Sequence, residues 1–259
     1  MFLRLLVIHI AVASFLAVSQ AIAVEEQARG WGSAWIVPHS AEERVARERS
    51  DRLEKAVNAQ DWATVAKILE ELEPTSPKSW ELQSIEGYVA TLRHLYLEAV
   101  TYYDRALTFL PQSNGIEGSK LYVDRATAQA LNGSYHAARV DLEKAIALDK
   151  SNLLAHNNYA WLLATCPDDS VRDGQRAVKH ARGASETLKH GSPMVLDTLA
   201  AAEAEIGDFR SAVKDEKRAL SLAKGDRSLY SQHLQSYMMA NPVREAPEPP
   251  KTPASLKKS

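Results

Sequence analysis

The chain has 259 residues, of which 45% are hydrophobic, 25% charged and only 7% aromatic, a composition typical of a soluble globular protein. Its net charge of −2 excludes the broad positive field with which many proteins attract nucleic acid or acidic membranes. The single cysteine, Cys166, excludes a disulfide within the chain, and a protein of this length can bury a sufficient core without one.

The first 23 residues differ from the rest of the chain. Arg4 is their only charge, an apolar run follows over 5–18, and the segment closes on Ala21-Ile22-Ala23. A positive start, an apolar middle and a small-x-small ending predict a secretory signal peptide over 1–23, cleaved after its last alanine. We therefore expect an exported protein, periplasmic or secreted. The alternative is an N-terminal membrane anchor, because the apolar stretch over 5–24 is just long enough to span a bilayer.

Residues 24–39 contain two glycines, two tryptophans and a proline, which predicts an irregular leader. Ser40 and Glu43 then form the pattern of a capping box, in which the serine oxygen accepts a backbone N–H and the glutamate reaches back. A helix is therefore expected from about Ala41 to about Ala59. It opens a helical region that we place over 40–240.

Small residues recur through this region at fixed offsets. In most sets the first two are twelve residues apart and the last two are seven apart. The register returns after roughly 34 to 40 residues, a period typical of a stacked helical array. Small side chains let helices approach to about 8–10 Å between axes while larger neighbours interdigitate. The four sets are Gly87, Ala99 and Ala106; Ala126, Ala138 and Ala145; Ala160, Ala177 and Ala184; and Ala200, Ala212 and Ala219.

The segment 133–149 has a glycine turn, an aromatic residue, an alanine, a large apolar residue and a second alanine in order. It resembles the second helix of the tetratricopeptide repeat (TPR), a helix–turn–helix of about 34 residues. The segment 207–222 matches nearly as well, and 96–111 makes a third copy. The segment 61–77 is a degenerate copy, as expected of a terminal repeat that has only one neighbour.

One copy departs from the common register. Its first helix has the sequence NNYAWLLATCPD over 157–168, which resembles a variant repeat of bacterial exported and multidomain proteins. Ala160 and Ala177 are seventeen residues apart, so five residues are inserted between the two helices. Pro167 is expected to end the first helix and Asp173 to cap the second.

The resemblance implies an all-α protein, a right-handed α-solenoid of about five helix–turn–helix repeats. A capping helix over 227–239 would cover the exposed end of the stack. Five prolines over 241–259 preclude a helix and predict a Pro-rich, extended or disordered tail, whose two PxxP spacings would also suit a proline-binding module. The repeat copies are expected near 46–79, 80–113, 119–152, 153–192 and 193–226.

No motif of an enzyme or a metal site stands out. The sequence has no glycine-rich phosphate loop, no nucleophile elbow and no paired-cysteine motif. Its eight histidines lack the i, i+4 spacing of a helical zinc site, and each is expected on the surface or in a turn. Cys166 has no activating base nearby in sequence, so we expect a buried, inert thiol. We therefore expect no enzyme activity, no cofactor and no metal.

Binding is what the resemblance does imply. In the TPR family the first helix of each repeat lines a concave groove that holds an extended or helical peptide. Tyr88 and Trp161 are the expected anchors, because aromatic side chains dominate binding hot spots, and Asn157 is a candidate partner for a peptide backbone. The alternative is that Trp161 packs between repeats and Asn157 contacts the adjacent turn. Carried over by register, the candidate peptide-binding residues are Glu81, Ser84, Tyr88, Lys120, Thr127, Asn157, Trp161 and Asp197.

One subset of the family clamps a terminal carboxylate with basic and amide side chains. Lys120 and Asn158 would fit such a clamp, but Ser84, Thr127 and Asp197 stand at neighbouring positions and leave it incomplete. A mixed, slightly acidic groove is expected instead, suited to a neutral or basic ligand.

We therefore predict a non-enzymatic scaffold that holds a partner peptide or protein in the cell envelope. One alternative is a structural spacer or a membrane-tethered assembly factor, and another is an enzyme that uses the repeat as scaffold. No nucleic-acid partner is expected, and a membrane is expected to be involved only if the N-terminal segment remains uncleaved.

The signal-peptide interpretation is directly testable. N-terminal sequencing of the exported product should give a first residue of Val24, because signal peptidase cleaves after the small-x-small site. A product that starts at Met1 would contradict cleavage and favour the anchor.

Overall fold

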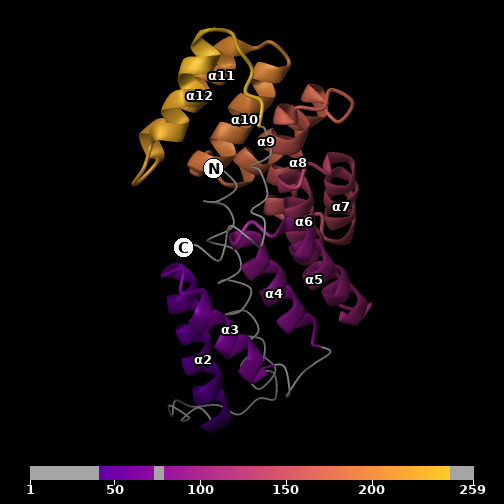
Figure 1. Cartoon of the computed structure of the whole chain (residues 1–259). Coiled ribbons are helices and arrows are strands. Elements are labelled where there is room, and N and C mark those ends of the chain that lie inside the picture. Colours follow the sequence, from indigo (N-terminus) through magenta and orange to yellow (C-terminus); the bar gives the residue numbers. More distant parts are fainter. Residues whose placement is uncertain (1–40, 73–78, 246–259) are drawn as a thin grey trace, which may run out of the picture.

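The structure is a computed structural model that describes residues 41–72 and 79–245 (Figure 1). The predicted signal peptide, the leader with Ser40, and residues 246–259 of the tail lie outside the described residues. Within these ranges the chain forms eleven α-helices and no strand. The helices are α2 (Ala41–Asn58), α3 (Trp62–Leu72), α4 (Trp80–Leu92), α5 (Tyr96–Phe109), α6 (Gly115–Leu131), α7 (Tyr135–Leu148), α8 (Leu153–Thr165), α9 (Gly174–Thr187), α10 (Pro193–Glu205), α11 (Phe209–Leu222) and α12 (Ser228–Met238).

Consecutive helices pack as pairs: α2 with α3, α4 with α5, α6 with α7, α8 with α9, and α10 with α11. Each pair packs on the next, and α12 packs on α11 and α10 at the end of the array (Figure 1). The predicted all-α fold is thereby confirmed: the chain is an α-solenoid of helix–turn–helix repeats. No helix in the described part of the chain is both long and apolar enough to cross a bilayer.

The recurring small residues lie where paired helices cross. All twelve are buried, and Ala138, Ala145 and Ala212 are fully inaccessible. At Gly87 of α4 the approach is very close: an added Cβ would lie 2.8 Å from Cε1 of the Tyr103 ring on α5. Tyr103 is itself buried, so its ring has little room to yield. The small residues therefore determine how closely each pair packs, as the sequence pattern predicts.

Local signals set the helix ends. Six helices are preceded by a residue whose side chain accepts the backbone N–H three residues further along, a bond that satisfies an otherwise unpaired donor. The predicted cap at Asp173 is among them. Gly133 and Gly207 follow α6 and α10 with φ of 79° and 82°, a left-handed conformation that favours glycine at a helix end. The six capping residues are Asp61, Ser79, Asn152, Asp173, Ser192 and Asp208.

A matched pair of glycine substitutions tests the packing argument. Gly87→Ala should destabilise the protein by about 1–3 kcal/mol, because the new methyl group overpacks the Tyr103 ring. Gly183→Ala is the control: it lies inside α9 with nothing within 4 Å of the added Cβ, so removing its backbone freedom should stabilise by about 0.5–1 kcal/mol. Urea unfolding followed by circular dichroism measures both, and effects of the same sign would contradict the proposed contact.

Candidate functional site

The predicted binding residues lie on the first helices of four repeats, α4, α6, α8 and α10. We call the side of these helices that carries them the first-helix face. Glu81, Ser84 and Tyr88 belong to α4, Lys120 and Thr127 to α6, Asn157 and Trp161 to α8, and Asp197 to α10. Their exposure divides this face into two halves, because the residues on α4 and α6 are part-buried whereas those on α8 and α10 are buried.

The half formed by α4 and α6 gathers charged groups around a tyrosine. Lys120 Nζ pairs with Glu117 Oε1 at 2.8 Å, and Asp124 lies one helical turn further along the same face of α6. Asp124 is close enough to Tyr88 for its charge to act on the phenol: burial and the Asp124 carboxylate raise the pKa of Tyr88 to about 12. Sequence reasoning missed Asp124, although its spacing of four residues from Lys120 was a usable signal.

The environment of Asp124 disfavours its charged form. Burial raises the pKa of its carboxyl to about 7, the positive charge of Lys120 opposes the rise, and Glu117 adds to it. This half of the face therefore holds an acid that is only partly ionised near neutral pH, beside a tyrosine. The remaining predicted residues there are tied locally: Ser79 Oγ donates to Glu81 Oε2 at 2.5 Å, and Thr127 Oγ1 donates to the Val123 carbonyl at 2.9 Å.

The half formed by α8 and α10 is covered by the chain itself. Asn157, Trp161 and Asp197 are only 1%, 5% and 0% exposed. His233 of α12 accounts for part of this cover: its ring centroid lies 5.8 Å from that of Trp161, and its Nδ1 lies 2.7 Å from Asp197 Oδ1. Trp161 thus packs inside the array, which agrees with the alternative that the sequence left open for it.

Residues 241–245, which we call the return segment, complete the cover. In Figure 1 the chain leaves α12 and turns back towards α8 and α10. The Glu245 backbone N–H donates to the Thr165 carbonyl of α8 at 2.9 Å, and the Trp161 indole N–H donates to the Glu245 carboxylate. Burial raises the pKa of that carboxyl, and the indole bond opposes the rise. The start of the predicted tail is therefore docked on the first-helix face.

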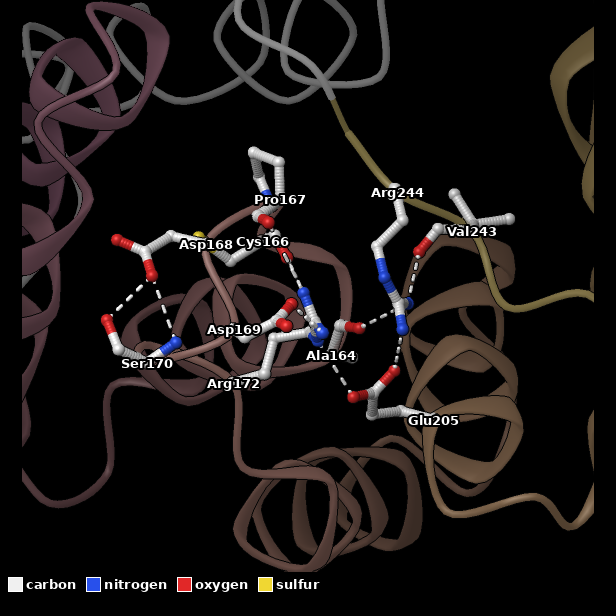
Figure 2. Close-up of polar contacts among 10 residues, drawn as sticks. All are labelled: Ala164, Cys166, Pro167, Asp168, Asp169, Ser170, Arg172, Glu205, Val243 and Arg244. Carbon is white, nitrogen blue, oxygen red and sulfur yellow. Dashed lines mark hydrogen bonds and ion pairs between the residues drawn. The ribbon is translucent and has the colours of Figure 1, made fainter.

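The long turn between α8 and α9 is linked to the return segment through Glu205 of α10. Figure 2 shows Glu205 of α10 between two arginines: Arg172 Nε lies 2.9 Å from its Oε1, and Arg244 Nη2 lies 2.6 Å from its Oε2. Arg172 also donates to the Cys166 carbonyl at 2.8 Å and pairs with Asp169. The five residues inserted in this repeat thus provide the arginine that helps to anchor Glu205.

Two expectations about reactive side chains have different outcomes. Cys166 is buried, as expected, and burial raises the pKa of its thiol, which disfavours the nucleophilic thiolate. The expectation that every histidine lies on the surface or in a turn is wrong for His233, which lies within α12 and is 7% exposed. His94 is equally buried, but it lies in the turn after α4. Tertiary packing decides this: His233 bonds to Asp197, which is 36 residues away, so no local spacing could reveal the contact.

Asn157 keeps one unsatisfied group. Its Nδ2 lies 3.5 Å from the Asn158 Oδ1, and its own Oδ1 has no hydrogen-bond partner among the described residues. Because the side chain is 1% exposed, a ligand on the surface does not reach this oxygen in the present arrangement. The predicted residues that remain accessible are therefore those on α4 and α6.

Comparison with known proteins supports the fold. No protein-family model matches the sequence, and no curated protein matches it. Two crystal structures of MamA are each 18% identical to the chain; they cover 66% and 68% of it and 93% and 90% of their own chains, with TM-scores of 0.52 and 0.51. The TPR domain of P58(IPK) matches at 9% identity over 78% of this chain and 70% of its own, with a TM-score of 0.34. The likeness to MamA shows a shared helical-repeat fold and leaves the function to the residues of this chain.

The part-buried acid on α6, Asp124, predicts a pH dependence. The pKa of the Asp124 carboxyl is about 7 in the folded chain and 3.8 ordinarily, so folding makes this carboxyl hold its proton more tightly. Its contribution to stability is therefore fully present below about pH 4 and is lost as pH rises through about 7. Asp124→Asn cannot ionise, so its stability relative to wild type should be greater at about pH 8 than at about pH 5, by about 1–2 kcal/mol.

Urea unfolding of both proteins at the two pH values measures this difference. Glu98→Gln, at an exposed position on α5, is the control for the simple loss of a carboxylate. A stability difference between wild type and Asp124→Asn that stays constant with pH would contradict the assignment.

Proposed function

We propose that the chain is a protein-binding scaffold whose partner contacts the first-helix face of α4 and α6. The observation that carries the proposal is the division of this face into two halves. The chain's own α12 and return segment cover the half on α8 and α10, whereas Tyr88, Lys120 and Asp124 remain part-buried on the other half. A part-buried tyrosine is the residue type that most often anchors a protein interface, because it offers a large apolar area and a polar tip.

The charges on this half favour a neutral or basic partner segment. Glu81, Glu117 and Asp124 stand against Lys120 alone, so the local charge is acidic. A lysine or arginine of the partner would pair with Asp124 and could stack on the Tyr88 ring, which attracts cations over its face. Such a pairing would also favour the ionised form of Asp124, because a nearby positive charge stabilises a carboxylate.

The scaffold itself needs little rearrangement to bind. Helices α4 to α7 are held together by the buried small residues and by the Arg125 guanidinium, which bonds to Asp141 at 2.6 Å and to Asp104 at 2.5 Å. A rigid surface binds with a smaller loss of conformational entropy than a flexible one. We propose that the chain acts by holding its partner, without catalysis.

We further propose that the partner belongs to the cell envelope. This rests on the signal-peptide pattern over 1–23, which would export the chain. A structural spacer is the competing function, and it differs in one measurable respect: a spacer would need no contact through Tyr88.

Site-specific photocrosslinking distinguishes these functions without relying on a destabilising variant. A benzophenone amino acid replacing Tyr88 should crosslink a partner in envelope extract. The same replacement at Tyr102, a part-buried tyrosine on the second helix α5, is the matched control and should give no such product. Equal crosslinking at both positions, or at neither, would count against the proposed surface.

Substitutions then test the chemistry with the crosslinked partner in hand. Tyr88→Ala should weaken binding by about thirty-fold, the effect of losing a hot spot worth about 2 kcal/mol. Asp124→Lys should weaken the binding of a basic partner further, because the new lysine repels the partner's positive charge. Tyr102→Ala should leave the affinity unchanged. Affinities measured by fluorescence polarisation would contradict the proposal if Asp124→Lys bound more tightly than wild type.

A further inference from the structure

Three acid–base side chains from three different helices meet inside the last repeat. Asp197 of α10, Glu216 of α11 and His233 of α12 each place one potential ligand atom within 4.8 Å of the others. Asp197 and Glu216 are fully inaccessible to solvent, and His233 is 7% exposed. Buried acidic groups carry a high cost unless a proton, a cation or hydrogen-bond donors compensate their charge.

The described residues leave much of this compensation unmade. Among the described residues no N–H or O–H group donates to Asp197 Oδ2 or to either carboxylate oxygen of Glu216, whose polar contact is the Asp197 carboxyl itself. The hydroxyl of the buried Tyr237 likewise has no hydrogen-bond partner within this part of the chain. No lysine or arginine in the described ranges forms an ion pair with either carboxylate. An unmade hydrogen bond at a buried polar group costs about 1–3 kcal/mol, more when the group is charged. Several such groups around one point indicate a ligand that all of them share.

The donor set indicates what kind of ligand this is. Imidazole nitrogen together with two carboxylate oxygens suits a divalent transition metal, whereas magnesium and calcium prefer oxygen ligands alone. Zn²⁺ is held by such ligands at about 2.0–2.2 Å, which places ligand atoms about 3.3 Å apart in a tetrahedral site. The three ligand atoms lie within 4.8 Å of one another, so a tetrahedral site requires them to draw together by up to about 1.5 Å.

We propose that Asp197, Glu216 and His233 bind one divalent transition-metal ion of the Zn²⁺ class as a structural site. Tyr237 lies one turn after His233 on α12, and its buried hydroxyl has no hydrogen-bond partner among the described residues, which makes it a candidate fourth ligand. The site would be closed to solvent, as structural zinc sites are.

The metal would add a contact between α12 and the paired helices α10 and α11 at the end of the array. It would fix α12 to α10 and α11, and with it the His233 ring that packs on Trp161. The return segment follows α12 and bonds to the same tryptophan. Metal binding would therefore stabilise the cover over α8 and α10. This inference is independent of the proposed partner surface on α4 and α6.

The first experiment measures Zn²⁺ binding by the purified, chelator-treated chain. Isothermal titration should give one tight equivalent for wild type, little response to Mg²⁺, and a rise in Tm with Zn²⁺. Glu216→Gln and His233→Gln should each bind Zn²⁺ at least about tenfold more weakly, since each removes one ligand. His180→Gln is the matched control: His156 and His180 form a second imidazole pair, with their Nδ1 atoms 2.7 Å apart, and its loss should leave the tight equivalent unchanged.

A second measurement covers the case in which a core variant fails to fold. X-ray absorption at the zinc edge of wild type should show one imidazole nitrogen with oxygen ligands. Two imidazoles would assign the zinc to His156 and His180 and overturn the proposal. Absence of tight Zn²⁺ binding by wild type, or equal affinity in wild type and Glu216→Gln, would also overturn it. In those cases a proton shared by the two carboxylates is the compensating ligand.

Discussion

The close approach of paired helices at buried small residues is the constraint on which the rest of the structure depends. At Gly87 the backbone of α4 lies so near the Tyr103 ring that a single added methyl group would overlap it. Alanines hold the equivalent crossings in the following repeats. Within each pair, one side of each helix is buried in this contact. The first helix of the pair therefore has another side free of it, and the candidate binding residues lie on that side.

That first-helix face is not uniform along the array. On α4 and α6 it carries a tyrosine among partly buried charges, and on α8 and α10 it is an internal surface beneath α12 and the return segment. The last repeats therefore use the face to complete their own core. The inserted turn between α8 and α9 belongs to the same arrangement, because Arg172 and Arg244 hold Glu205 from opposite sides (Figure 2).

Packing α12 on this surface places polar groups where a repeat would normally bury apolar ones. Asp197 and Glu216 sit in the interior of the last repeat, where His233 bonds to Asp197 and no lysine or arginine of the described residues pairs with either carboxylate. A purely hydrophobic end would be simpler and would avoid the desolvation cost. The proposed metal ion would compensate the buried charges and link the three helices. The stability of the covered half would then depend on an ion that the open half does not need.

The sequence by itself determined the all-α repeat fold, because small residues at a regular period leave few other ways to bury the helices. It also indicated local features such as the cap at Asp173 and the buried, inert Cys166, which depend on neighbours a few residues away. Only the tertiary structure decided which groove positions remain accessible. Trp161 is covered by Glu245, which is 84 residues further along the chain, and Asp197 by His233, which is 36 residues further along. Such contacts follow from how the array ends and turns back on itself, and a repeat register carries no information about that return.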